Sequence, residues 1–195
     1  TTSLVPGARD DADFKAACAA GQDRPNVKVY PIVVPANTLV LRAALRQSDV
    51  SDPADDHDLV VVAPDGSSVY SGTAISNESV QIGAPAPGTY KVCVLAYGGG
   101  ATMTHRLSSW VVKVGDTGGN FRTMMPSQVY PGSTATVGLS WSGLAPGGRY
   151  MGGVQFRDAS GVPSATTVVR VETNGGLPLS EPGDVAAAKL RVRAD

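Results

Sequence analysis

The sequence predicts an all-β protein made of two tandem antiparallel β-sandwiches. Apolar residues come in short runs rich in Val, Ile, Tyr and Thr, which are typical of half-buried strands. The 23 glycines and 14 prolines among 195 residues supply many turns between these runs. The runs are interrupted at "GDTGGN" (115–120), where apolar periodicity stops. We therefore expect one domain over residues 1–116 and a second over residues 120–195.

The first segment contains seven candidate strands. They cover residues 27–34, 38–45, 58–63, 67–72, 78–82, 89–97 and 106–114. Alternation is strict in the run 90–96, where Tyr90, Val92, Val94 and Ala96 would share one face. The turn "APDGSS" (63–68) carries an Asp-Gly pair that tolerates positive φ, as hairpins require. Seven short strands joined in this way predict an antiparallel sandwich.

The second segment has fewer strand signals. Strand-like runs cover residues 134–141, 149–156 and 166–173, and about 75 residues are few for a complete sandwich. Helix formers occur at 11–20, where one or two turns would end at Gly21, and at 184–193. For the latter we favour a last strand formed by "KLRVR" (189–193).

Composition argues against nucleic acid and membrane partners. The net charge is -1 and basic residues are not clustered, whereas phosphate binding needs grouped Lys and Arg. Unbroken apolar runs of ~18 residues are absent, so a spanning helix is not expected. The start "TTSLVPGARDD" lacks a basic region followed by an apolar one, so we expect a mature or excised fragment without a signal peptide.

The two cysteines, Cys18 and Cys93, are too far apart in sequence to suggest a metal site. As a disulfide they would stabilise the fold by roughly 4 to 5 kcal/mol in the entropic model. A disulfide would also imply an oxidising compartment. The alternative is a pair of buried free thiols.

The residues do not predict catalysis by this chain. A hydrolase needs a nucleophile, a base and an orienting group, but neither histidine is well placed for this role. The neighbours of His57 in "ADDHDLVVVAPDG" (54–66) would point to the opposite face of a strand. The string "GLSWS" (138–142) lacks the last glycine of a nucleophile turn.

Acidic residues gather in two stretches and suggest calcium, which prefers several oxygen ligands. The candidate ligands are Asp55, Asp56 and Asp58, together with Asp11 and Asp13 near the amino end. The alternative is a solvated loop that leads into a strand and keeps its edge soluble.

Aromatic residues offer a second kind of surface, for carbohydrate or protein. Trp110 and Trp141 lie in apolar runs and are expected in the core. Four tyrosines are expected to be partly exposed: Tyr30, Tyr70, Tyr90 and Tyr97.

Three ordered pieces carry a family resemblance: "VPANTLVLRAAL", "DDHDLVVVAPDGSSVYSG" and "NESVQIGAPAPGTYKVCVLAY". Over residues 25–114 they resemble the bacterial pre-peptidase C-terminal domain, a jelly-roll-like β-sandwich that follows the catalytic domain of secreted proteases. Asn37 stands where that family usually has glycine. The second segment is similar to fibronectin type III-like modules, through Trp141 at the end of one run and Tyr150 at the start of the next.

Together the two resemblances imply the C-terminal tail of a secreted subtilisin-like serine protease. The chain would then be non-catalytic and extracellular and would partner the catalytic domain of the same full-length chain. It would either bind an insoluble protein substrate such as collagen or keratin or stabilise that catalytic domain. Related collagen-binding modules hold calcium between a loop like 55–58 and an acidic amino-terminal segment. An extracellular carbohydrate- or cell-surface-adhesion module is the alternative, because sandwiches serve both tasks.

Overall fold

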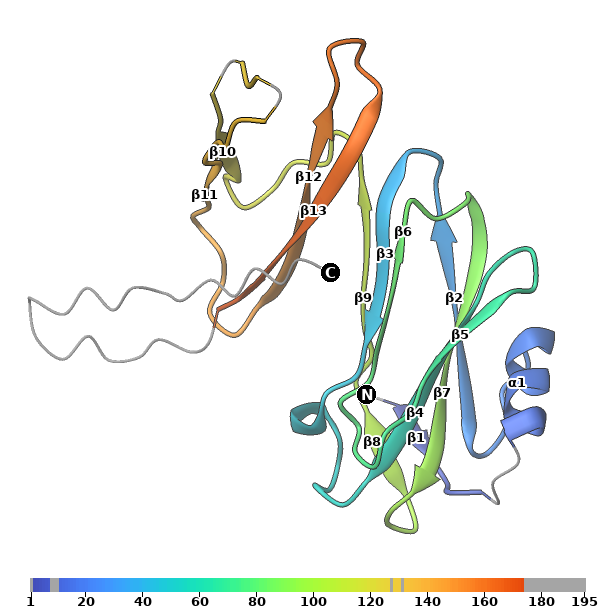
Figure 1. Cartoon of the computed structure of the whole chain (residues 1–195). Coiled ribbons are helices and arrows are strands. Elements are labelled where there is room, and N and C mark those ends of the chain that lie inside the picture. Colours follow the sequence, from blue (N-terminus) through green and yellow to red (C-terminus); the bar gives the residue numbers. More distant parts are fainter. Residues whose placement is uncertain (1, 8–10, 127, 131, 174–195) are drawn as a thin grey trace, which may run out of the picture. The chain divides into compact units, whose positions relative to one another are not determined.

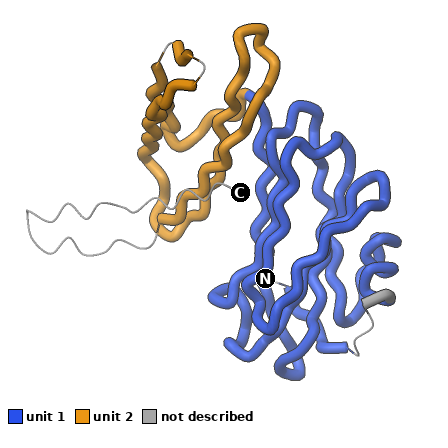
Figure 2. Tube along the Cα trace, in the orientation of Figure 1, with its two compact units in different colours: residues 1–114 blue, residues 115–195 orange. Residues whose placement is uncertain are grey.

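The computed structural model describes residues 2–7, 11–126, 128–130 and 132–173, and it is mostly β. The chain divides into two compact units, residues 1–114 and 115–195 (Figure 2). The described part contains no helix that is long and apolar enough to cross a membrane.

Unit 1 is built on two antiparallel sheets (Figure 1). In the described residues one sheet has the order β2-β7-β4-β5 and the other has the order β6-β3-β9. The strands are β2 (Val27–Val34), β3 (Thr38–Ala44), β4 (Asp56–Val62), β5 (Ser68–Ser71), β6 (Ser79–Gly83), β7 (Gly88–Gly98) and β9 (Ser108–Lys113). A 3-10 turn, η1 (Gln47–Asp49), follows β3. All seven strands coincide with the runs expected from the sequence.

A further pair, β1 (Thr2–Leu4) with β8 (Met103–His105), was not expected. Three residues are too few to show alternation, so these strands leave no periodic signal in the sequence.

The main core of unit 1 lies between the two sheets. Leu41 of β3, Leu59 of β4 and Val92 of β7 belong to one buried cluster. The alternation expected in β7 is confirmed, since Tyr90, Val92, Val94 and Ala96 all belong to this cluster. Tyr90 is only 2% exposed, so its expected partial exposure is wrong: it shares the inward face with its alternate neighbours.

A second cluster lies on the outer face of the β2-β7-β4-β5 sheet, under helix α1 (Asp11–Ala20). Figure 1 shows the helix beside this sheet. Phe14 and Cys18 of the helix pack with Val60 of β4 and Leu95 of β7. The disulfide between Cys18 and Cys93 joins the helix covalently to the middle of the sheet. The helix expected at 11–20 is therefore confirmed, and its burial comes from this face.

Helix α1 ends in a Schellman motif. The Gly21 N–H donates to the carbonyl oxygen of Cys18, the Gln22 N–H donates to that of Ala17, and Gly21 has φ 72°. Gly21→Ala is expected to lower the free energy of unfolding by roughly 1 to 2 kcal/mol, because a Cβ is strained in this region of φ. Urea denaturation measures the change. Gly118→Ala is the control, since nothing lies within 4 Å of its Cβ position; equal effects from both would contradict the motif's role.

The described part of unit 2 consists of two antiparallel pairs. β10 (Arg122–Met124) pairs with β11 (Gly138–Ser140), and β12 (Arg149–Arg157) pairs with β13 (Pro163–Glu172). The expected strand 134–141 shortens to β11, because residues 134–136 are exposed and gain no burial from pairing. The expected strand 189–193 lies outside the described residues. Trp141, like Trp110 of unit 1, is half-buried rather than part of a buried core.

Candidate functional site

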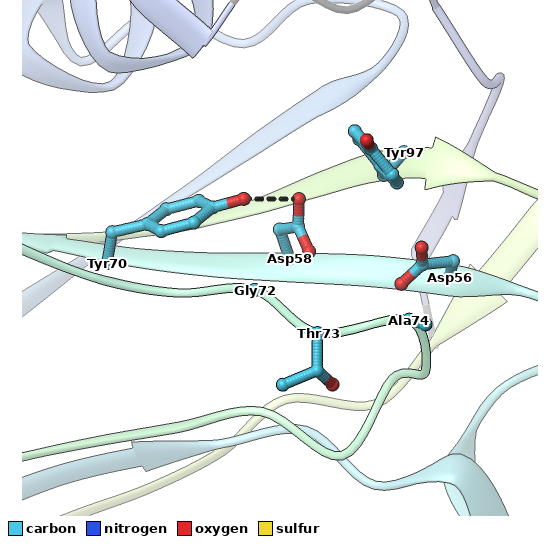
Figure 3. Close-up of a pocket in the computed structure, with 7 residues that line it drawn as sticks. All are labelled: Asp56, Asp58, Tyr70, Gly72, Thr73, Ala74 and Tyr97. Atoms are coloured by element: carbon cyan, nitrogen blue, oxygen red, sulfur yellow. Dashed lines mark hydrogen bonds between the residues drawn. The ribbon is translucent and has the colours of Figure 1, made fainter.

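A cavity of about 490 Å³ opens on unit 1, where β4 begins (Figure 3). Its lining comes from three strands and one loop: Asp56 and Asp58 of β4, Tyr70 of β5, Tyr97 of β7, and Gly72, Thr73 and Ala74. Because side chains alternate along β4, Asp56 and Asp58 reach the cavity while His57 between them enters the core. The cavity therefore combines two carboxylates with two phenol rings.

Asp58 and Tyr70 are hydrogen-bonded to each other within this lining. The Tyr70 hydroxyl donates to Asp58 Oδ2 over 2.6 Å, and Asp58 is only 2% exposed (Figure 3). Tyr70 packs edge-on against Phe14 of α1, with 6.4 Å between ring centroids. Lys15 Nζ lies 5.4 Å from the Tyr70 centroid, so this ring already accepts a cation on its face. The helix and the cavity thus share Tyr70.

The loop at 72–74 is held in place by a buried carboxylate. Glu78 is 1% exposed and accepts hydrogen bonds from the Thr73 N–H (2.7 Å), the Thr73 hydroxyl (2.6 Å) and the Ser71 hydroxyl. Three donors on one carboxylate fix the backbone of this wall. The cavity is therefore shaped before any ligand binds, which lowers the entropy cost of binding.

Asp55, directly before β4, fixes the adjoining loop instead of lining the cavity. Its carboxylate accepts hydrogen bonds from the Ser51 hydroxyl (2.5 Å), the Asp52 N–H (3.0 Å) and the Gly100 N–H (3.2 Å). Burial alone raises the pKa of Asp55, but these hydrogen bonds outweigh it and hold the pKa below its ordinary value. Asp55 is thus an ionised structural group.

The two histidines meet on the opposite face of β4, inside the core. His57 and His105 are 0% and 1% exposed, and their ring centroids are 5.1 Å apart. Burial lowers the pKa of His57, an effect partly offset by the charge of Asp55. The expectation that Asp56 and Asp58 do not orient His57 agrees with this geometry, since His57 bonds to Ser76.

The residues expected to bind calcium are placed differently from one another. Asp56 and Asp58 line the cavity, Asp55 is engaged by the loop, and Asp13 is exposed on α1. Asp11 is the first residue of α1, and its side chain is outside the description. Among the described residues, no three His, Cys, Asp or Glu side chains form a group that could hold a metal ion. The expected pairing of Cys18 with Cys93 is confirmed.

Several residues of the site could not be chosen from the sequence. Tyr70 and Tyr97 were among the tyrosines expected to be exposed, but alternation does not say which of them face one cavity. Thr73 and Glu78 gave no signal, because their role depends on a loop that folds back on its own strand.

Comparison with known proteins finds no family model that matches the chain and no curated protein with significant similarity to it.

Proposed function

We propose that the chain is a non-catalytic accessory region of a secreted subtilisin-like serine protease that binds protein substrate. Unit 1 would be the jelly-roll-like, pre-peptidase C-terminal part and unit 2 the fibronectin type III-like part. The resemblance of residues 25–114 supports the first assignment. The disulfide is consistent with an extracellular location, since such bonds persist in oxidising compartments.

The observation that carries binding is the cavity of unit 1. Two carboxylates and two phenol rings favour a ligand group that is positively charged and carries N–H donors. Lysine and arginine side chains of a protein have this chemistry. Asp58, buried beside Tyr70, supplies charge in a poorly solvated position, where an ionic hydrogen bond is stronger than on an open surface. We infer that the cavity takes a basic side chain of the substrate.

The alternative is a carbohydrate- or cell-surface-adhesion module. Tyr70 and Tyr97 are at least partly exposed, and sugar rings pack against such aromatic faces. A sugar would pack against the rings and donate hydroxyl hydrogen bonds to Asp58, but it carries no positive charge. The two functions therefore differ in whether the ligand must be cationic.

We expect the full chain to be retained on insoluble collagen and keratin and to be retained little on cellulose and chitin. Tyr97→Ala should weaken retention roughly tenfold or more, because it removes one aromatic wall. Tyr130→Ala is the matched control, since Tyr130 is an exposed tyrosine of unit 2. Retention on polysaccharide alone would favour the adhesion module, and no retention on any of these would overturn substrate binding.

Recognition of a positive charge by Asp58 is tested with two soluble peptides. They differ in a single lysine, which is unmodified and charged in one peptide and acetylated and neutral in the other. Asp58→Asn keeps the shape of the cavity and is expected to weaken binding of the lysine peptide roughly tenfold. Binding of the acetylated peptide should be weak in both proteins. Equal affinity for the two peptides, measured by calorimetry, would show that the cavity does not recognise a basic side chain.

A further inference from the structure

The buried histidine pair lies beside the first strand of the chain. In the β1–β8 register, Thr2 is opposite His105. The side chains of these two residues also meet through Tyr30 of β2, whose hydroxyl lies 2.9 Å from Thr2 Oγ1 and 2.8 Å from His105 Nε2. Leu4, at the end of β1, is buried in the main core. The strand β1 is therefore attached to the sandwich at the position of His105.

Hydrogen bonds assign a proton to one nitrogen of each ring. The Ser76 hydroxyl donates to the carbonyl oxygen of Asp55 over 2.8 Å, so it accepts from His57 Nδ1 at 3.2 Å. The Tyr30 hydroxyl donates to Thr2 Oγ1, so it accepts from His105 Nε2. His57 Nε2 and His105 Nδ1 are then the unprotonated nitrogens.

These two nitrogens are buried, and neither has a hydrogen-bond partner within the described part of the chain. A buried polar atom without a partner is rare and costly. Each lone pair can accept a proton, but the resulting charge would lie in the main core beside another imidazole ring. The pair is therefore stable only while both rings are neutral.

We propose that the His57–His105 pair is an acid-operated latch that holds strand β1 against β8 at neutral pH and releases it when His105 takes up a proton. The proton comes from solvent and binds His105 Nδ1. The cationic ring is relieved of its burial when β1 leaves, because this opens the core at Leu4 and lets water reach β8. β1 is the element to move because it is short and, in the described residues, pairs with β8 alone.

The charged groups around His105 do not stabilise its cation. Across from it, β4 contributes His57, which is itself titratable, and β2 contributes the Tyr30 phenol. Burial lowers the pKa of His57, and the charge of Asp55 offsets this only in part. Arg106, the residue after His105, forms an ion pair with Asp49, with 3.5 Å between the charged atoms. Burial first, and then the charge of His57 when that ring is protonated, lower the pKa of His105 to about 4.

The direction of the pH effect follows from this shift. An exposed histidine binds a proton near its ordinary pKa of 6.5, whereas folded His105 does so only near 4. The opened form therefore binds more protons between these values. The stability of the closed form is fully present above about pH 6.5 and is lost as the pH falls toward 4.

Hydrogen exchange of the full chain, corrected for intrinsic rates, tests the latch. Opening of the peptide that covers residues 2–5 is expected to increase more than about tenfold between pH 7 and pH 4.5. Peptides from β7 serve as the internal control and should change far less. His105→Gln keeps a donor for Tyr30 but removes the titration of His105, so the increase of its β1 opening in acid should be several-fold smaller, with only the buried His57 left to titrate.

A nuclear magnetic resonance titration of His57 and His105 in the wild-type protein tests the latch without the His105→Gln variant. We expect His105 to carry its proton on Nε2 at pH 7 and to titrate near pH 4 while β1 is closed. Titration near 6.5 with β1 still protected would overturn the proposal. Opening of β1 that is independent of pH, or equal acid opening in His105→Gln, would also overturn it.

Discussion

Replacing both cysteines by alanine is expected to lower the free energy of unfolding of unit 1 by at least about 4 to 5 kcal/mol. The cross-link closes a loop between residues 75 positions apart, and in the entropic model it stabilises the fold by restricting the unfolded chain. Both residues are fully buried, so the substitutions also remove two sulfur atoms from the cluster under α1. The two effects act in the same direction.

The measurement needs a probe that reports on unit 1 alone. The chain has two tryptophans, Trp110 in unit 1 and Trp141 in unit 2. In a Trp141→Phe background, the fluorescence of Trp110 follows urea unfolding of unit 1 by itself. The Cys18→Ala/Cys93→Ala variant is compared with the same protein carrying both cysteines.

Reductant separates the cross-link from the packing. Reduced protein that keeps both sulfur atoms should lose most of the stability that the double variant loses, and reductant should not affect the double variant. A loss below about 1 kcal/mol on reduction would show that the loop constraint contributes little. A large loss in the variant alone would assign the effect to packing.

The same substitution is expected to change the cavity. Helix α1 contacts Tyr70 through Phe14, and Tyr70 holds Asp58. If the disulfide is what keeps α1 on the sheet, its loss lets this end of the cavity move. Binding of a lysine peptide should then weaken in conditions where unit 1 is still folded, because Asp58 loses its fixed partner.

Strand positions in unit 1 could be predicted because one physical signal determines them. In β7, residues that face the main core alternate with residues that face α1, so the sequence shows the strand and both of its faces. Helix α1 was predictable from its helix formers and from Gly21, which its Schellman motif requires. Short strands such as β1 have no such pattern, and β1 is held by its pairing with β8 and by the burial of Leu4.

The candidate site was predictable only in part, because its residues are joined by tertiary contacts. The acidic stretch at 55–58 was selected for its charge, but the structure gives its members three different surroundings. Asp55 turns to Gly100, 45 residues away, whereas His57 meets His105, 48 residues away, in the core. Asp56 and Asp58 face the cavity. Alternation separates faces, but it does not say what lies opposite each face.

Asp55→Ala is expected to lower the free energy of unfolding of unit 1 by about 3 kcal/mol. Asp55 is buried, and the substitution removes the acceptor of the Ser51 hydroxyl and of the Asp52 and Gly100 N–H groups. A hydrogen bond to a charged group contributes ~1.5 to 3 kcal/mol, and water replaces part of this because Asp52 and Gly100 are exposed. Asp55→Asn retains one acceptor oxygen and should cost about half as much. Asp52→Ala is the control, because Asp52 is exposed and its carboxylate accepts from the nearby Ala54 N–H.

The pH dependence distinguishes a loss of charge from a loss of shape. The pKa of Asp55 is lowered in the folded protein, so its contribution is present above the ordinary value of 3.8 and is lost as the pH falls through the lower folded value. The gap in stability between wild type and Asp55→Asn should therefore close in acid. If the gap persists there, or if Asp55→Ala costs no more than Asp52→Ala, the carboxylate does not organise this loop. The loop at 51–55 would then depend on Gln47, whose side chain donates to the carbonyl oxygens of Pro53 and Asp55.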